Sequence, residues 1–328
     1  MDKEHFHPKG PAVVDRSLTL EMVRVTERAA IAAAGWRGKG DEKAADRAAV
    51  DAMRAEMNQM DIAGRIVIGE GERDEAPMLF IGEEVGNGNG PQVDIAVDPL
   101  EGTTLCAKNQ ADSLAVLALA ERGGLLHAPD VYMQKIAIGP GYPEGVIDID
   151  EPASDSALKL AKAKGVDVSE ITVCILDRPR HAQIVEEMRK VGASVKLIYD
   201  GDIAGVIHAA MTDDTGIDMY MGTGGAPEGV LGAAALRCLG GQMQGRLVLD
   251  TAEKRERSER LGISDPDKIY GVKELASGDV LFAATGVTNG SMLRGVQIRP
   301  HSVRTSTIVM RSWSKTLRWV DARHQRDD

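Results

Sequence analysis

Two carboxylates and a hydroxyl group lie within six residues at the end of one apolar run. Asp98, Glu101 and Thr103 follow residues 93–97, whose sequence VDIAV is typical of a β-strand. Carboxylate oxygens bind hard divalent cations such as Mg²⁺, which also bind phosphate oxygens. A hydroxyl group one turn further on can orient a water molecule beside that phosphate. The segment therefore predicts metal-assisted chemistry on a phosphate.

A second apolar run also ends in acids. Residues 65–68, RIVI, are followed by Glu70, Glu72 and Asp74 within the next six positions. Because both runs are predicted strands that neighbour one another in the chain, we expect their acidic ends to lie close together. A plain solvated loop is the alternative interpretation of these acids.

A predicted helix that begins near Asp41 directs a further acid toward the same region. Its apolar stripe, at spacings of three and four, consists of Val50, Met53, Met57 and Met60. Extended backward, the stripe reaches Asp46 and then Lys43, so we expect Asp46 to point inward. An ordinary ion pair between Asp46 and Lys43 is the alternative.

Crowded acids need protons or cations. Two carboxylates about 4 Å apart repel by about 4 kcal/mol at an effective dielectric of 20. Mg²⁺ or Mn²⁺ would offset that repulsion, and two such ions can hold both ends of an in-line displacement. No Cys or His cluster offers a zinc site instead. The predicted ligands are Asp46, Glu70, Asp98, Glu101 and Glu228.

The remaining patterns predict an α/β protein with two halves. In residues 1–150, predicted helices over 17–34 and from 41 onward precede a largely antiparallel sheet, with strands at 65–68, 93–97, 113–120 and 132–138. In residues 151–328 helices and strands alternate, which indicates a mostly parallel sheet. Its strands are predicted at 171–176, 195–199 and 217–221, and its helices at 154–165, 182–191, 203–211 and 230–239. We expect metal binding in the first half and substrate binding in the second.

Polar loops follow the three strands of the second half. They contain Arg178-Pro179-Arg180, Asp200-Gly201-Asp202 and the glycine-rich stretch 222–229. Since parallel sheets bind ligands beyond the carboxyl ends of their strands, these loops predict one binding rim. The stretch 222–229 lacks the G-x-G-x-x-G spacing, but a dinucleotide-binding oxidoreductase remains an alternative from another class of enzyme.

The composition predicts a cytoplasmic protein. The 328 residues contain 43% hydrophobic and 27% charged residues, and no run approaches the ~20 apolar residues of a membrane span. The N-terminal residues lack the apolar core of a signal peptide. Three cysteines form no metal or disulfide pattern. A net charge of −11 speaks against nucleic acid as a partner and leaves a metal-neutralised small phosphate as the expected ligand.

The order of these motifs resembles the GlpX-type class II fructose-1,6-bisphosphatases, which are lithium-sensitive, metal-dependent sugar phosphatases. The resemblance spans nearly the whole chain and rests on residues 40–46, 68–78, 94–103, 128–133, 200–202 and 224–229. It implies a layered α/β/α/β/α fold and the same five metal ligands. It also implies hydrolysis of the C1 phosphate of fructose 1,6-bisphosphate, in gluconeogenesis or another sugar-phosphate cycle, with Mn²⁺ or Mg²⁺ as cofactor.

The resemblance also implies roles for individual residues. The substrate residues would be Glu101, Gly102, Thr103, Tyr132, Arg178, Pro179, Arg180, Asp200, Gly201, Asp202 and Gly225. Lys43, Glu72 and Asp74 would lie beside the reacting phosphate, with Asp74 helping Thr103 to orient the attacking water. A homodimer or homotetramer is expected.

Two residues depart from the pattern of this family. Arg178 stands where relatives often have Lys, and Thr104 stands where they often have Arg. The nearest alternative keeps the chemistry and adds sedoheptulose 1,7-bisphosphate as a substrate. An inositol phosphatase-like enzyme is a further alternative, and it would not need the distal phosphate contact expected of Arg178 and Arg180.

Overall fold

The computed structural model describes residues 14–71 and 77–326. Within these residues the α-helices are α1 (Leu18–Ala34), α2 (Glu42–Met57), α3 (Thr103–Ala107), α4 (Ala153–Lys164), α5 (Ala182–Val191), α6 (Asp202–Ala210), α7 (Thr212–Thr215), α8 (Ala226–Leu239), α9 (Ala252–Arg260) and α10 (Val272–Leu275). None of the helices in this part of the chain is long and apolar enough to cross a bilayer. The helices expected from the sequence at 17–34, after Asp41 and through the second half are present.

The first sheet has the order β12-β13-β11-β4-β3-β1-β2, and β14 pairs with β13. Its strands are β1 (Ala63–Ile68), β2 (Glu84–Val85), β3 (Gln92–Glu101), β4 (Leu114–Glu121), β11 (Val280–Gly286), β12 (Gln297–Arg299), β13 (Ser302–Arg311) and β14 (Thr316–Gln325). Among these strands only β1 and β3 are parallel neighbours. The prediction of a largely antiparallel sheet is confirmed.

The second sheet has the order β10-β9-β5-β8-β6-β7. Its strands are β5 (Tyr132–Ile138), β6 (Thr172–Leu176), β7 (Ser194–Ile198), β8 (Met219–Gly225), β9 (Gln242–Leu247) and β10 (Ile269–Gly271). The three strands predicted to be parallel, β6, β7 and β8, are parallel. The other three are antiparallel to their neighbours, so the sheet is mixed and the prediction of a mostly parallel sheet was too simple.

The sheets do not follow the two halves of the sequence. Residues 132–138, expected in the first sheet, form β5 in the middle of the second, where β5 pairs with β8 and β9. Conversely, β11 to β14 return to the first sheet and extend it beyond β4. Strand membership therefore crosses position 150, while the division into two subdomains there stays a prediction.

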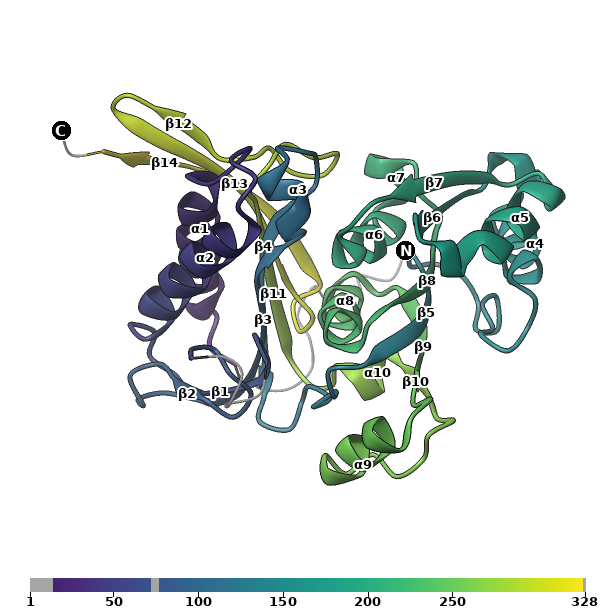
Figure 1. Cartoon of the computed structure of the whole chain (residues 1–328), viewed down its shortest axis with the longest axis horizontal. Coiled ribbons are helices and arrows are strands. Elements are labelled where there is room, and N and C mark those ends of the chain that lie inside the picture. The colour runs from purple at the N-terminus through teal and green to yellow at the C-terminus, as the bar shows by residue number, and fades with distance from the viewer. Residues whose placement is uncertain (1–13, 72–76, 327–328) are drawn as a thin grey trace, which may run out of the picture.

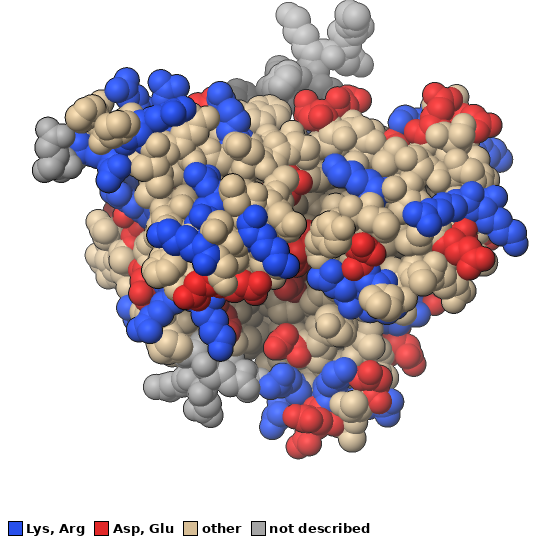
Figure 2. Space-filling model, turned by 45° about the horizontal axis from the view of Figure 1, so that its top comes forward, with Lys and Arg blue, Asp and Glu red and all other residues tan. Residues whose placement is uncertain are grey.

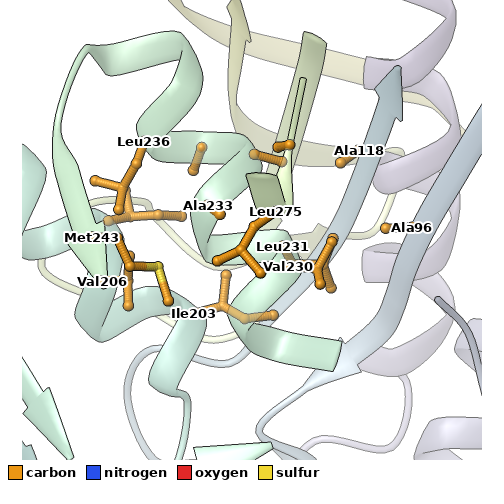
Figure 3. Close-up of a cluster of buried hydrophobic side chains, with 14 of the residues drawn as sticks. Ala96, Ala118, Ile203, Val206, Val230, Leu231, Ala233, Leu236, Met243 and Leu275 are labelled. Atoms are coloured by element: carbon orange, nitrogen blue, oxygen red, sulfur yellow. The ribbon is translucent and has the colours of Figure 1, made fainter. Parts of the chain in front are cut away.

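The elements stack in five layers, as the resemblance implied (Figure 1). Helices α1 and α2 cover the outer face of the first sheet. Helices α6, α8 and α10 lie between the two sheets, and α4 and α5 cover the outer face of the second. Figure 3 shows part of the middle layer, where Val230 and Leu231 of α8 lie near Ala96 and Ala118 of the first sheet.

Small residues allow α8 to fit between two sheets. A Cβ atom on Gly229 would lie 2.6 Å from Sδ of Met133 on β5, and one on Gly232 would lie 3.1 Å from Val206 on α6. Such distances leave no room for a side chain unless the neighbours move. Because α8 touches both sheets, the acid in its first turn, Glu228, is held between them.

Candidate active site

A cavity of about 330 Å³ lies between the two sheets. Its walls come from α2, from the segments after β1 and β3, from the β7–α6 loop and from the start of α8. Figure 2 shows acidic side chains in the hollow that separates the two halves of the molecule. The polar lining residues are Asp46, Glu70, Asp98, Glu101, Thr103, Asp130, Asp200 and Glu228. All five carboxylates singled out in the sequence therefore meet in one cavity.

The end of β3 is shaped by local backbone geometry. Asp98 Oδ1 accepts a hydrogen bond from the backbone N–H of Leu100 at 3.1 Å, which fixes the turn around Pro99. Gly102 has φ 74°, a left-handed conformation that side chains disfavour, and it lies just before α3. Thr103 is thus the first residue of a short helix and lines the cavity.

Glu101 joins the first sheet to the helix layer. Its side chain is 5% exposed, and its Oε1 accepts from the backbone N–H of Ile203 on α6 at 3.0 Å. Its own carbonyl oxygen accepts from Ser113 Oγ at 3.0 Å. Glu101 is therefore held both at its backbone carbonyl oxygen and at Oε1 of its side chain.

The other carboxylates reach the cavity from three different elements. Asp46 projects from α2 and is half-buried, as the apolar stripe of that helix predicted. Glu70 follows β1, and Glu228 is the third residue of α8. Glu228 Oε2 is buried without a hydrogen-bond partner among the described residues. A buried charged oxygen in that state requires a proton or a cation.

Burial, and after it the neighbouring negative charges, raises the pKa values of these acids. Burial, together with the negative charges of Asp46 and Asp98, raises the pKa of Glu70 to about 8. Burial, followed by the charge of Asp202, raises the pKa of Glu228 to about 7. Without a cation, the site therefore retains protons near neutral pH.

Asp98 and Glu101 form a coupled pair. Burial is the main cause that raises the pKa of Asp98, to about 6, and the charge of Asp46 adds to it. Burial and the charge of Asp98 raise the pKa of Glu101 well above its usual range, and the two carboxyl groups share a hydrogen bond. We infer that Glu101 carries the shared proton, which a bound cation would displace.

The donor set fits a hard cation. Within the described ranges 14–71 and 77–326, no group of three or more His, Cys, Asp or Glu side chains already has the arrangement needed to hold a metal ion. The donors around the cavity are all oxygens, one of them buried and unpartnered on Glu228, and the pKa values of Glu70 and Glu228 are raised first by burial and then by neighbouring negative charges. These are the properties expected of Mg²⁺ or Mn²⁺ ligands.

The sequence as a whole matches the family described as bacterial fructose-1,6-bisphosphatase, glpX-encoded, over residues 16–324. The chain belongs to this family. A relative from Synechococcus sp. (strain JA-3-3Ab) is 49% identical over 96% of this chain and 97% of its own length. One from Trichodesmium erythraeum (strain IMS101) is 47% identical over 95% of this chain and 97% of its own. Both are named D-fructose 1,6-bisphosphatase class 2/sedoheptulose 1,7-bisphosphatase.

Membership in the fructose-1,6-bisphosphatase family makes the chain a metal-dependent phosphatase of carbohydrate metabolism. The stretch 222–229, which left a dinucleotide-binding oxidoreductase open, belongs to β8 and the start of α8. It supplies Glu228 to the cavity, and a Cβ atom on Gly225 would lie 1.8 Å from Glu228 Oε2. A glycine is needed at position 225 because the Glu228 side chain occupies the space that a Cβ atom would take.

The expected distal-phosphate residues lie outside the cavity wall of this bisphosphatase. Arg180 Nε and Nη2 donate to the carbonyl oxygen of Thr223 at 3.0 and 2.6 Å, and its guanidinium group lies 4.9 Å from the ring centroid of Tyr132. Tyr132 pairs with Gly225 across β5 and β8, and neither Tyr132 nor Arg180 lines the cavity. Arg178 Nη1 donates to the carbonyl oxygen of Asp177 at 3.0 Å. Their contact with substrate stays a prediction.

Two further expected groups differ in their placement. Asp200 lines the cavity, and Gly201, with φ 86°, lets its N–H donate to Asp200 Oδ1 at 3.1 Å. Asp202 is buried behind it, 6% exposed. Lys43 is exposed and does not line the cavity. Glu72 and Asp74 lie outside the described residues.

Two residues at the site were missed in the sequence. Lys135 on β5 is 2% exposed and forms an ion pair with Asp202, and its Nζ donates to the carbonyl oxygen of Gly225 at 2.7 Å. It shares a strand face with the buried Met133, which was the available signal. Asp130 lines the cavity and follows the Ala128-Pro129 pair of a motif already recognised.

Proposed function

We propose that this chain hydrolyses the C1 phosphate of fructose 1,6-bisphosphate to give fructose 6-phosphate and inorganic phosphate. The observation that supports the proposal is the convergence of Asp46, Glu70, Asp98, Glu101 and Glu228 on one cavity beside Thr103. These acids would hold Mn²⁺ or Mg²⁺, which would supply Lewis-acid polarisation of the phosphoryl oxygens and a lowered pKa of the attacking water.

The protein itself positions the reactants. Thr103, at the first turn of α3, orients the attacking water through its hydroxyl group, assisted by a nearby carboxylate such as Asp74. Lys43 and Glu72 act beside the reacting phosphate. Glu101 lines the cavity, and the N–H of Ile203 holds its carboxylate in place there. Positioning and electrostatic stabilisation then account for most of the rate enhancement, as in phosphoryl transfer generally.

The sugar and its second phosphate occupy the side of the cavity formed by the second sheet. Asp200 and Asp202 accept hydrogen bonds from sugar hydroxyl groups, and the turns at Gly102, Gly201 and Gly225 let the substrate approach the backbone. Arg178 and Arg180, stiffened by Pro179, bind the distal phosphate. Tyr132 supports Arg180 through the cation–π contact observed in the structure.

Sedoheptulose 1,7-bisphosphate is a second substrate to test, because the names of the relatives include that activity. The uncharged Thr104, half-buried next to Thr103, is smaller than an arginine and so leaves more space beside residues 98–103. We further propose a cytoplasmic homodimer or homotetramer.

Phosphate release from fructose 1,6-bisphosphate, with Mn²⁺, with Mg²⁺ and with a chelator, tests the proposal. We expect release that requires a divalent cation, and none from fructose 6-phosphate. Comparable turnover of sedoheptulose 1,7-bisphosphate under the same metal would establish the bifunctional enzyme. Absence of release from either bisphosphate with both metals would refute the proposed function.

A further inference from the structure

Two arginines oppose each other on the first sheet, where β11 and β4 separate β13 from β3, the strand that carries Asp98 and Glu101. Arg304 on β13 pairs in register with Arg323 on β14, and Gln297 on β12 pairs with Arg304. Residues paired in register in an antiparallel sheet project from the same face. A row of Gln297, Arg304 and Arg323 therefore crosses three strands.

The paired arginines are a destabilising arrangement in the protein alone. Like charges directly opposite each other across two strands repel, whereas opposite charges at such positions attract. Arg304 and Arg323 are exposed, and neither has a hydrogen bond or ion pair within residues 14–71 and 77–326. Asp321, two residues before Arg323, lines the same cavity, but its carboxylate is paired with Arg294 at 2.6 Å. Within the described residues, no carboxylate therefore forms an ion pair with Arg304 or Arg323.

The two arginines line a cavity of about 220 Å³. The amide of Gln297 and the hydroxyl group of Ser306, which pairs with Asp321, add neutral hydrogen-bond donors to the same wall. None of these residues lines the cavity that holds the carboxylates. The volume suits a small polar molecule and is too small for a folded partner.

The surroundings strengthen the positive field. From Arg294 to Arg326 the sequence has eight Lys and Arg residues and one acid, Asp321, in a chain whose net charge is −11. Figure 2 shows Lys and Arg side chains gathered at the end of the molecule where β12 and β14 lie. Such a field attracts anions and repels cations.

We propose that this row is a second oxyanion site, which binds the phosphoryl group of a small molecule. The two guanidinium groups form charge-assisted hydrogen bonds to the phosphoryl oxygens, and Gln297 and Ser306 complete the set of donors. Binding removes the repulsion between Arg304 and Arg323, so the anion stabilises the sheet end as it binds. The site is independent of catalysis at the carboxylate cavity.

Thermal unfolding at constant ionic strength tests this proposal, with inorganic phosphate replacing chloride. For the wild-type protein we expect the Tm to rise with the logarithm of the phosphate concentration above the Kd, by about 2–4 °C at a tenfold excess over the Kd. Arg304→Gln and Arg323→Gln should match or exceed the wild-type Tm in chloride, because one of two repelling charges is gone. Both should lose most of the phosphate-dependent rise, because titration calorimetry should show about tenfold weaker phosphate binding.

Arg318→Gln is the matched control. Arg318 lies on the same strand but projects from the opposite face, so this variant loses the same charge and should keep the wild-type response. Any phosphate bound at the carboxylate cavity is common to all variants and cancels in the comparison. Methyl phosphate in place of inorganic phosphate distinguishes an ester ligand from the free ion.

Three results would overturn the proposal. The first is an equal rise of Tm when chloride is added in place of phosphate to the same ionic strength, which would show charge screening alone. The second is an unchanged phosphate response in both Arg304→Gln and Arg323→Gln. The third is an equal loss of response in Arg318→Gln. Retained phosphate release from fructose 1,6-bisphosphate in each variant confirms that the variant is folded.

Discussion

Replacing Glu70 with Gln should raise the free energy of unfolding of the metal-free protein. It should also reduce the stabilisation that Mn²⁺ provides. Its pKa rises from 4.5 to about 8, chiefly through burial and then through Asp46 and Asp98. An acid whose pKa is raised on folding contributes stability that is complete below 4.5 and is lost as the pH rises through 8. Glutamine resembles the protonated acid at every pH, so Glu70→Gln should remove this loss.

The size of the effect follows from the shift. At pH 8 the folded group is half-protonated, so about 3.2 pH units of linkage have accumulated at 1.36 kcal/mol each. This sets an upper value of about 4 kcal/mol for the advantage of Glu70→Gln over the wild type in the metal-free state. The two proteins should have similar stability near pH 4.5.

Urea unfolding from pH 5 to pH 8, with a chelator and with Mn²⁺, measures this difference. Without metal, the wild-type free energy of unfolding should fall with rising pH while that of Glu70→Gln falls less. Mn²⁺ should stabilise the wild type and have less effect on the variant. The exposed Glu144 provides a matched control as Glu144→Gln. Parallel pH curves for wild type and Glu70→Gln would refute the reasoning.

Three further substitutions test other parts of the site. Lys135→Met should lower the free energy of unfolding by about 3–5 kcal/mol, because Asp202 is left buried and unpaired. Adding Asp202→Asn should restore part of that free energy. No recovery in the double variant would contradict the pairing. Gly225→Ala places a Cβ atom 1.8 Å from Glu228 Oε2 and should lower kcat/KM by about 10²-fold while raising the Mn²⁺ requirement, with an unchanged metal titration as the contrary result. Arg180→Ala should raise KM for the bisphosphate by about tenfold with little change in kcat, and an unaltered KM would remove it from phosphate binding.

The sequence predicted the features that depend on local patterns. Asp98 and Glu101 could be placed at the end of a strand because the apolar run before them is continuous, and Asp46 could be placed inward because it extends a helical stripe. Their meeting in one cavity agrees with that expectation. Their role as metal ligands stays a prediction.

The features that depend on distant pairing could not be predicted in the same way. β5 is as apolar as a strand of either sheet, and only its pairing with β8 and β9 places it in the second. β9 contains a glycine and no β-branched or aromatic residue, so its strand signal is weak. The buried position of Lys135 depends on Asp202, which lies 67 positions later in the chain.

Manganese binding by equilibrium dialysis tests the central claim most directly, with wild-type protein, Asp98→Asn and, as a control, Asp150→Asn at an exposed acid. The acids around the cavity are proposed to hold the cation that makes the phosphate ester reactive. We therefore predict that the wild type and Asp150→Asn bind Mn²⁺ equally and that Asp98→Asn loses both Mn²⁺ binding and phosphate release. Unchanged Mn²⁺ affinity and stoichiometry in Asp98→Asn would contradict the claim.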